Sequence, residues 1–206
     1  MTPTGLTATE LDDIQQLNRA FLRLIAAEPD IARPLAAELS PALATALAAD
    51  GLGEVLLAEP IPFLLFDVSL PRQPVAAPTL FCPSPNVVEL ALLALGFMQR
   101  LGRRERFALR VAGGVTAVEL ELLLRLNIDD IGRTIRAVDN PVRPALCRPP
   151  FLWPAMLSAA ARHDRSRLKT LFSLGHQHRL QRAAGEGGRS RRAARAIGVA
   201  ERTLER

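Results

Sequence analysis

The sequence aligns with itself at an offset of 76 residues, and this constrains the fold more than any other feature. Two blocks match without a gap, residues 21–33 with 97–109 and residues 39–59 with 115–135. Phe21 then meets Phe97, and the predicted helix cap Ser40 meets Thr116. Identity is low, so chance alignment of two Leu- and Ala-rich helical stretches is the alternative. The shared caps and the shared hydrophobic phase favour two copies of one helical unit.

Both halves are expected to be helical. Apolar residues make up 49% of the chain, mostly Leu and Ala, and aromatic residues only 4%, which favours helices over sheets. Thr7 and Glu10 have the spacing of a capping box, and an amphipathic stripe follows them. Further long helices are predicted at 86–102, capped by Asn86, and at 154–174. Shorter helices are predicted near Ile31 and at 42–49, 53–58, 105–111, 117–126 and 129–138.

Seven prolines lie between Pro60 and Pro85, so no helix can cross this stretch. The apolar run at 61–66 is predicted to be a strand or buried extended chain. We therefore expect an all-α fold with two similar helical units, a proline-rich linker and a basic C-terminal extension. The expected segments are repeat 1 at 1–68, the linker at 69–85, repeat 2 at 86–150, a C-terminal helix at 151–184 and a basic tail at 185–206.

The order of elements in one repeat resembles the FlhD family of bacterial flagellar transcription regulators. The matching segments are LNRAFLRLI (17–25), LSPALATALAA (39–49), LGEVLLAE (52–59) and FLLFDV (63–68). The match covers about residues 10–68 and, more weakly, 87–140. It rests on hydrophobic spacing rather than on chemical signatures. FlhD carries one copy per chain, so a tandem copy departs from that family.

This resemblance implies a helical protein that dimerises through its long helices and acts in a transcription-activating complex. Its implied partner is an FlhC-like subunit, a protein with a four-cysteine zinc site that this chain lacks. The apolar stripe of Leu17, Phe21 and Leu24 is the predicted surface for self-association. A tandem copy is also able to form, within one chain, the pairing that FlhD makes between two chains.

No motif in the sequence indicates catalysis or metal binding. Cys82 and Cys147 are too few for a disulfide scaffold or a structural zinc site. His176 and His178 are two apart, whereas ligands on one helix face stand three or four apart; the third histidine is His163. Asp129 and Asp130 open a predicted helix, where their charge offsets the helix dipole. We expect no enzyme activity, no metal and no cofactor.

Charge is unevenly distributed along the chain. Residues 1–96 carry net −7, residues 97–160 carry net +4 and residues 161–206 carry net +8. The segment GRSRRAARAIGVAERTLER (188–206) resembles the helix-turn-helix of Fis-type regulators, with its turn at Gly198. The chain ends before a full recognition helix, and a disordered basic tail is the alternative. The predicted DNA-contacting residues are Arg189, Arg191, Arg192, Arg195, Arg202, Thr203 and Arg206.

The leading hypothesis is a transcriptional regulator or co-activator of FlhD type that contacts DNA through its basic tail. The alternative is a helical adaptor, chaperone or anti-activator that binds proteins and no DNA. An enzyme of unrecognised type is the third hypothesis. The N-terminus lacks a signal-peptide pattern, and no apolar run approaches the roughly 18 residues that cross a bilayer. A cytoplasmic protein without membrane contact is therefore expected.

Overall fold

The computed structural model describes residues 5–28, 52–69, 84–136, 138, 140–147 and 150–204. It does not describe the side chains at positions 128, 134 and 185–204. The described part has the predicted all-α character, with a single two-stranded sheet among its helices. The helices predicted near Ile31 and at 42–49 lie outside the described residues, as does most of the proline-rich linker.

Helix α1 (Ala8–Ala27) begins at the predicted capping box. The Thr7 side chain accepts from the Glu10 backbone N–H, and the Glu10 carboxylate accepts from the Thr7 backbone N–H. The helix ends at Glu28, directly before Pro29, because the residue before a proline disfavours helical backbone. Its buried residues recur every three or four positions: Ile14, Leu17, Asn18, Phe21, Leu22, Leu24 and Ile25.

Four described helices lie between residues 85 and 136. They are α5 (Pro85–Arg104), α6 (Arg106–Gly113), α7 (Ala117–Arg125) and α8 (Ile128–Arg136). The predicted cap at Asn86 is wrong, because the Ser84 side chain caps α5 and Pro85 takes the first helical position, where its missing N–H costs nothing. Thr116 and Glu119 form a second capping box at the start of α7.

The single helix predicted at 154–174 is also wrong. The chain forms α9 (Leu152–Ala161), turns at residues 162–164, and then forms α10 (Arg165–Leu204). His163 takes a positive φ of 54° in this turn, and the Asp164 side chain accepts from the Arg167 backbone N–H at the start of α10. Helix α10 is 40 residues long and continues through Gly198, where the sequence suggested a turn.

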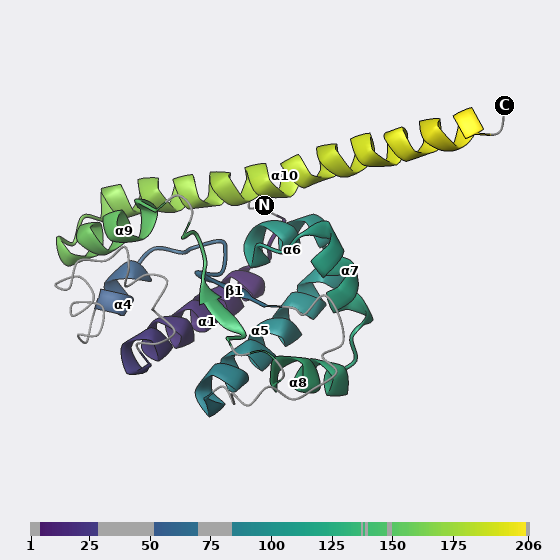
Figure 1. Cartoon of the computed structure of the whole chain (residues 1–206). Coiled ribbons are helices and arrows are strands. Elements are labelled where there is room, and N and C mark those ends of the chain that lie inside the picture. Colours follow the sequence, from purple (N-terminus) through teal and green to yellow (C-terminus); the bar gives the residue numbers. More distant parts are fainter. Residues whose placement is uncertain are drawn as a thin grey trace.

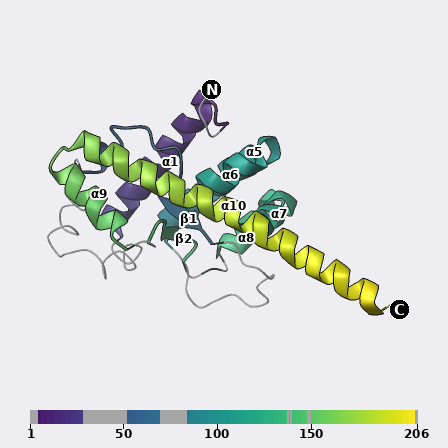
Figure 2. The same cartoon turned by 90° about the horizontal axis from the view of Figure 1, so that it is seen from above.

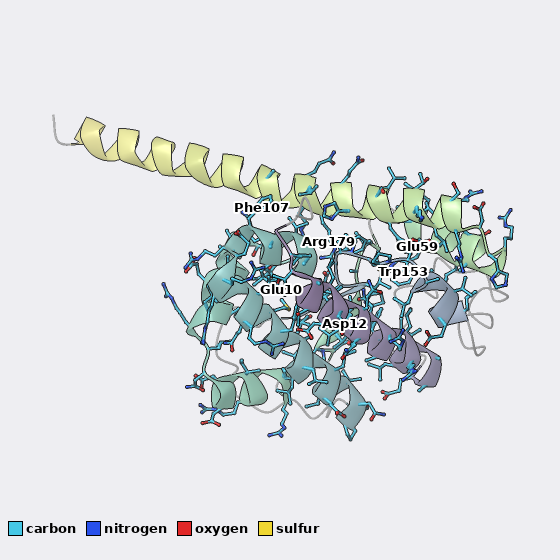
Figure 3. The ribbon with its side chains drawn as sticks, turned by 180° about the vertical axis from the view of Figure 1, so that it is seen from behind. Glu10, Asp12, Glu59, Phe107, Trp153 and Arg179 are labelled. Carbon is cyan, nitrogen blue, oxygen red and sulfur yellow. The ribbon has the colours of Figure 1, made fainter. Side chains whose placement is uncertain are left out.

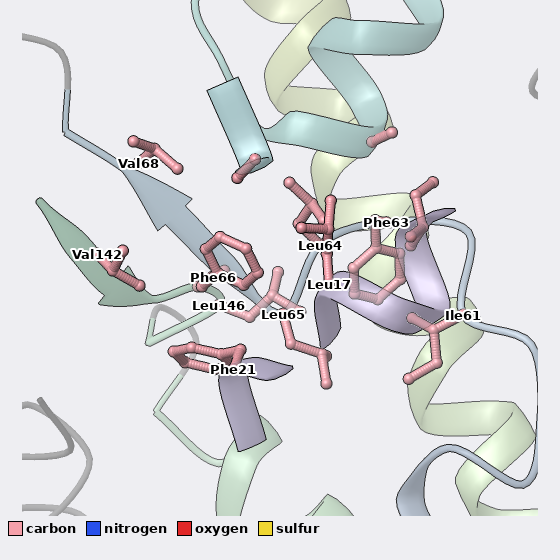
Figure 4. Close-up of a cluster of buried hydrophobic side chains, with 14 of the residues drawn as sticks. Leu17, Phe21, Ile61, Phe63, Leu64, Leu65, Phe66, Val68, Val142 and Leu146 are labelled. Atoms are coloured by element: carbon pink, nitrogen blue, oxygen red, sulfur yellow. The ribbon is translucent and has the colours of Figure 1, made fainter. Parts of the chain in front are cut away.

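A buried extended segment lies between α4 (Leu52–Leu56) and the sheet, as the apolar run at 61–66 suggested. Its apolar side chains are almost fully buried: Ile61, Phe63, Leu64, Leu65 and Phe66 (Figure 4). The segment ends in strand β1 (Phe66–Val68), which pairs antiparallel with β2 (Val142–Pro144). The centre of this helical protein is therefore non-helical chain.

Side-chain amides from α1 form hydrogen bonds with backbone groups of this extended segment. Asn18 is fully buried; its Nδ2 donates to the Phe63 carbonyl at 2.9 Å, and its Oδ1 accepts from the Leu65 N–H at 2.7 Å. Gln15 Nε2 donates to the Ile61 carbonyl at 3.1 Å. Buried backbone groups without such partners would cost free energy, so these amides allow the segment to be buried.

The described elements surround one hydrophobic core that draws on both halves of the chain. Helices α1 and α5 pack against each other beneath the extended segment, and α10 crosses the body and projects beyond it (Figures 1 and 2). Leu17, Phe21 and Leu24 are 7%, 0% and 6% exposed. These three side chains, predicted as an interface between copies, are core residues of one chain and form no exposed stripe.

Several elements recur at the 76-residue offset. Helix α4 begins at Leu52 and α8 at Ile128, while β1 and β2 span 66–68 and 142–144. Buried pairs at this offset are Ile14 with Leu90, Asn18 with Ala94, Phe21 with Phe97, Leu22 with Met98, and Ile25 with Leu101. In the strand ladder, Asp67 pairs directly with Arg143, its own counterpart. Two-fold-related copies would pair in this register, which supports the proposal that the halves are copies.

We predict that Asn18→Leu strongly destabilises the fold. The substitution leaves the Phe63 carbonyl and the Leu65 N–H buried without partners, at about 1–3 kcal/mol each. Urea denaturation followed by circular dichroism should show a loss of about 2–6 kcal/mol, on the same figures. Gln16→Leu, on the exposed face of the same helix, should change stability by less than about 0.5 kcal/mol. Equal stability of both variants would show that the Asn18 hydrogen bonds do not hold the segment.

Candidate functional site

Arg179 fixes α10 to the centre of the protein. Its side chain is only 4% exposed and points from α10 towards the core (Figure 3). One terminal nitrogen, Nη2, donates to the Leu64 carbonyl at 2.7 Å and lies 3.2 Å from an Asp67 carboxylate oxygen. The guanidinium also lies over the Phe63 ring, with its carbon 5.4 Å from the ring centroid. This one side chain therefore joins α10 to the extended segment and to β1.

The charge on Arg179 is only partly compensated. Burial lowers the pKa of its guanidinium, the Asp67 carboxylate opposes that shift, and the nearby positive charge of Arg182 adds to it. Arg179 stays protonated because its ordinary pKa is so high. Two of its buried nitrogens, Nε and Nη1, have no hydrogen-bond partner among the described residues. Within this part of the chain, the site thus holds a buried cation whose donors are not all satisfied.

Gly114 makes room for this guanidinium. It ends α6 with a positive φ of 68°, a conformation that favours glycine. A Cβ atom at this position would lie 2.0 Å from Arg179 Nη1 and 2.7 Å from an Asp67 carboxylate oxygen. Both the backbone conformation and the buried ion pair therefore require glycine here.

A cavity of about 490 Å³ lies beside this ion pair, between α10 and the sheet. Its lining residues come from β1, β2, the turn after β2, and α10: Asp67, Pro144, Leu146, Cys147, His178, Arg179 and Arg182. Leu146 takes a positive φ of 58°, which is strained for a bulky residue. The Trp153 indole N–H donates to the Ala145 carbonyl, and the Cys147 thiol donates to the Pro144 carbonyl at 3.3 Å. These bonds hold the turn in place.

A second cavity, of about 600 Å³, lies where α10 passes the segment after α4. Its lining residues are Glu59, Pro60, Pro62, Lys169, Phe172, Ser173, His176, Gln177 and Leu180. The His176 imidazole stacks on the Phe63 ring, with centroids 6.3 Å apart. Its buried Nδ1 has no hydrogen-bond partner in the part of the chain that the structure describes. Burial, followed by the nearby charge of Arg179, lowers the pKa of His176 below its ordinary value.

The predicted DNA-contacting residues lie at the end of the chain. Their positions from 189 to 203 fall in α10, within the part whose side chains are not described, and Arg206 lies outside the described residues. The described turn of α10 nearest to them is fixed to α6, because Arg110 Nη2 donates to the Ala183 carbonyl at 2.6 Å. Beyond this point, α10 leaves the body (Figure 1).

The other residues singled out in the sequence are dispersed. Cys147 is half-buried at the first cavity, and Cys82 lies outside the described residues. His163 is exposed at the turn between α9 and α10, and Asp129 and Asp130 lie in the first turn of α8. In the described ranges, no three His, Cys, Asp or Glu residues form a group able to hold a metal. Of the helices described, none has the length and apolar character to span a membrane.

Sequence analysis missed Asp67 and Arg179, although α10 carries a signal for the latter. Its buried positions recur at three- and four-residue spacing: Leu168, Leu171, Phe172, Gly175, Arg179 and Ala183. Arg179 therefore occupies the apolar face of the helix, where an arginine needs a buried partner. Asp67 had no such signal, because its pairing with α10 spans 112 residues of sequence.

We predict that His176 makes the fold sensitive to acid. Its pKa is lowered in the folded state, so the unfolded chain binds more protons as pH falls through the ordinary value of 6.5, and stability decreases. Urea denaturation at pH 7.5, 6.5 and 5.5 should show a smaller loss for His176→Gln than for the native chain. His163→Asn, at the exposed turn, is the control and should keep the native loss. The same loss in all three proteins would exclude a role for His176.

Comparison with known proteins identifies no relative: no protein-family model, no curated protein and no solved structure matches the chain.

Proposed function

We propose that this protein is a DNA-binding transcriptional regulator whose C-terminal helix, α10, contacts the nucleic acid. The observation that carries the proposal is the course of α10, which continues as a helix past Ala183 and projects beyond the body (Figures 1 and 2). A helix gains most of its stability from packing an apolar face, so a helix that projects in this way is suited to a partner.

The geometry of α10 fits a nucleic acid. The helix is held at its base by Arg179 and by the bond from Arg110 to the Ala183 carbonyl. The 20 residues from Gly185 to Leu204 then extend over about 30 Å. The major groove of B-DNA admits an α-helix. The basic regions of some DNA-binding proteins are single continuous helices that lie in this groove. The absence of a turn at Gly198 therefore replaces the helix-turn-helix hypothesis with a single basic helix.

Charge favours the same end of the molecule. Residues 161–206 carry net +8, whereas residues 1–96 carry net −7 and would be repelled by phosphates. Arg191, Arg195 and Arg202 are spaced by four and seven residues in the sequence, so in a continuous helix these positions share one face. Arginine suits this task because its planar donors bind phosphate oxygens and guanine edges in pairs.

The body of the protein suits an assembly of FlhD type. That family pairs two chains through long helices, and here α1 and α5 of one chain pack against each other. The symmetric pairing of Asp67 with Arg143 supports two copies within one chain. We infer that one chain takes the place of a dimer and joins an FlhC-like partner, which is the regulator or co-activator hypothesis.

The alternative is an adaptor or anti-activator that binds proteins alone. It is favoured by large apolar side chains on the surface of the second half: Leu93, Phe107 and Val118 are 57%, 47% and 68% exposed. Single exposed apolar residues are common on monomers, so they carry less weight than the projecting basic helix.

We predict that a chain truncated after Gly185 loses most DNA affinity. The full chain should bind a mixed-sequence duplex with an affinity that falls steeply with salt, because each neutralised phosphate contributes a slope of about −0.9. Fluorescence anisotropy at two salt concentrations measures this slope. The truncated chain keeps the described bonds that hold α10 to the body, so it should fold. If it binds DNA as tightly as the full chain, the adaptor hypothesis is the better one.

Single arginine variants distinguish the two kinds of contact that the helix makes. Arg191→Ala should weaken binding to every sequence and reduce the salt slope by about 1. Arg202→Ala should cost about 1–3 kcal/mol at one base position and relax the preference there. The control is Arg162→Ala, because Arg162 lies at the turn before α10, where it donates to Ser158. If Arg191→Ala and Arg202→Ala both act only on affinity, the helix makes no base-specific contact.

A further inference from the structure

The face of α10 that packs on the body continues along the projecting half of the helix. On the near half this face is marked by buried positions, which include Leu168, Phe172, Gly175 and Ala183. Position 204 lies 36 residues after position 168, which is about ten turns of a continuous helix. Positions 168 and 204 therefore point in the same direction from the helix axis.

This face is apolar again beyond the body. Positions 193, 197, 200 and 204 lie on it, and their spacing of four, three and four residues is that of the a and d positions of a coiled coil. We call these residues the distal stripe: Ala193, Ile197, Ala200 and Leu204. Because α10 projects past Ala183, the distal stripe lies outside the described body (Figures 1 and 2). An apolar face of this kind gains stability when a partner covers it.

The opposite face of the same segment is basic. Positions 191, 195 and 202, which are all arginine, lie about half a turn around the helix from the distal stripe. A partner that covers the stripe therefore leaves these arginines on the outside. The segment separates an apolar face from a basic one, so the two faces are able to bind different partners.

The order of large and small residues in the distal stripe matches a second copy of itself in the opposite direction. With a two-fold axis between residues 198 and 199, Ile197 meets Ala200 of the partner subunit, and Leu204 meets Ala193 of the partner subunit. Each large residue then lies opposite a small one, which fills the interface evenly. Two parallel copies would instead place alanine opposite alanine and leucine opposite leucine.

The position of the body excludes the parallel arrangement. Up to Ala183, the face of α10 that carries the stripe is covered by the chain's own body. A parallel partner helix would lie against this same face and run into the body. In the antiparallel arrangement the paired positions begin at 193, ten residues or about 15 Å beyond Ala183, so the two bodies stay apart.

We propose that the projecting half of α10 is a dimerisation helix, which pairs antiparallel with the same segment of a second copy of this chain through the distal stripe. The occupant is a second copy because the stripe complements itself in size and because the bodies leave room for this one direction. In the dimer, both basic faces point outward. This pairing does not rest on the proposed DNA binding.

The first test compares two substitutions that add the same charge to opposite faces of the segment. Sedimentation equilibrium of the native chain should give a mass that rises with concentration from 22.4 kDa towards twice that value. Ile197→Asp places a carboxylate in the stripe and should raise the Kd of the dimer by more than about tenfold. Val199→Asp, on the basic side, is the matched control and should keep the native Kd.

Three results would overturn the pairing: a native chain that stays monomeric at every concentration, an Ile197→Asp variant that dimerises like the native chain, and equal weakening by both substitutions. Circular dichroism should show the body folded in both variants, because both positions lie beyond its last described anchor at Ala183. No step involves DNA, so the dimer and the DNA-binding proposal succeed or fail separately.

The second test determines the direction of the pair. Ala193→Cys and Leu204→Cys are made in separate chains that keep the native cysteines, and the two variants are mixed and oxidised. The antiparallel dimer should form a disulfide between positions 193 and 204 of two chains, identified by mass spectrometry of the linked peptides. In either variant alone, the new cysteines would lie eleven residues or about 16 Å apart along the seam, whereas a disulfide needs Cα atoms within about 7 Å. A dimer that links 193 to 193 or 204 to 204, or that forms no link between 193 and 204, would contradict the antiparallel pairing.

Discussion

The structure depends on one constraint, the burial of extended chain inside a helical protein. A helix satisfies its own backbone hydrogen bonds, but residues 61–66 do not, and their side chains are buried. Their partners come from distant elements: the Asn18 amide on α1, the Ala112 carbonyl on α6, and the Arg179 guanidinium on α10. Each helix that supplies a partner is thereby fixed in position, so this segment determines how the helices are arranged around it.

The same constraint connects the core to the proposed functional end of the molecule. Arg179 binds the Leu64 carbonyl and Asp67, and Gly114 provides the space for its guanidinium. These contacts hold the base of α10 while the far half projects (Figure 3). The buried cation also lines the cavity between α10 and the sheet. One arginine therefore contributes to the burial of the extended segment, to the anchoring of α10 and to the lining of this cavity.

Local signals predicted much of the fold. The capping box of Thr7 and Glu10 marked the start of α1, and the apolar run at 61–66 indicated buried extended chain. The errors arose where local signals compete. Asn86 is a good cap, but Ser84 followed by Pro85 fixes the helix start earlier. The apolar stripe of α1 was assigned to an interface between copies, because periodicity shows that a face is buried and not what buries it.

The sequence by itself determined the helical class, the helix caps at Thr7 and Thr116 and the concentration of positive charge at the C-terminal end, because each is a local or additive property of the residues. Only the tertiary structure decided that α1 is buried within one chain, that Asp67 meets Arg179, and that α10 passes Gly198 without a turn. The first two depend on contacts between residues far apart in the chain. The third reverses a local preference of glycine for turns, which a helical backbone is able to override.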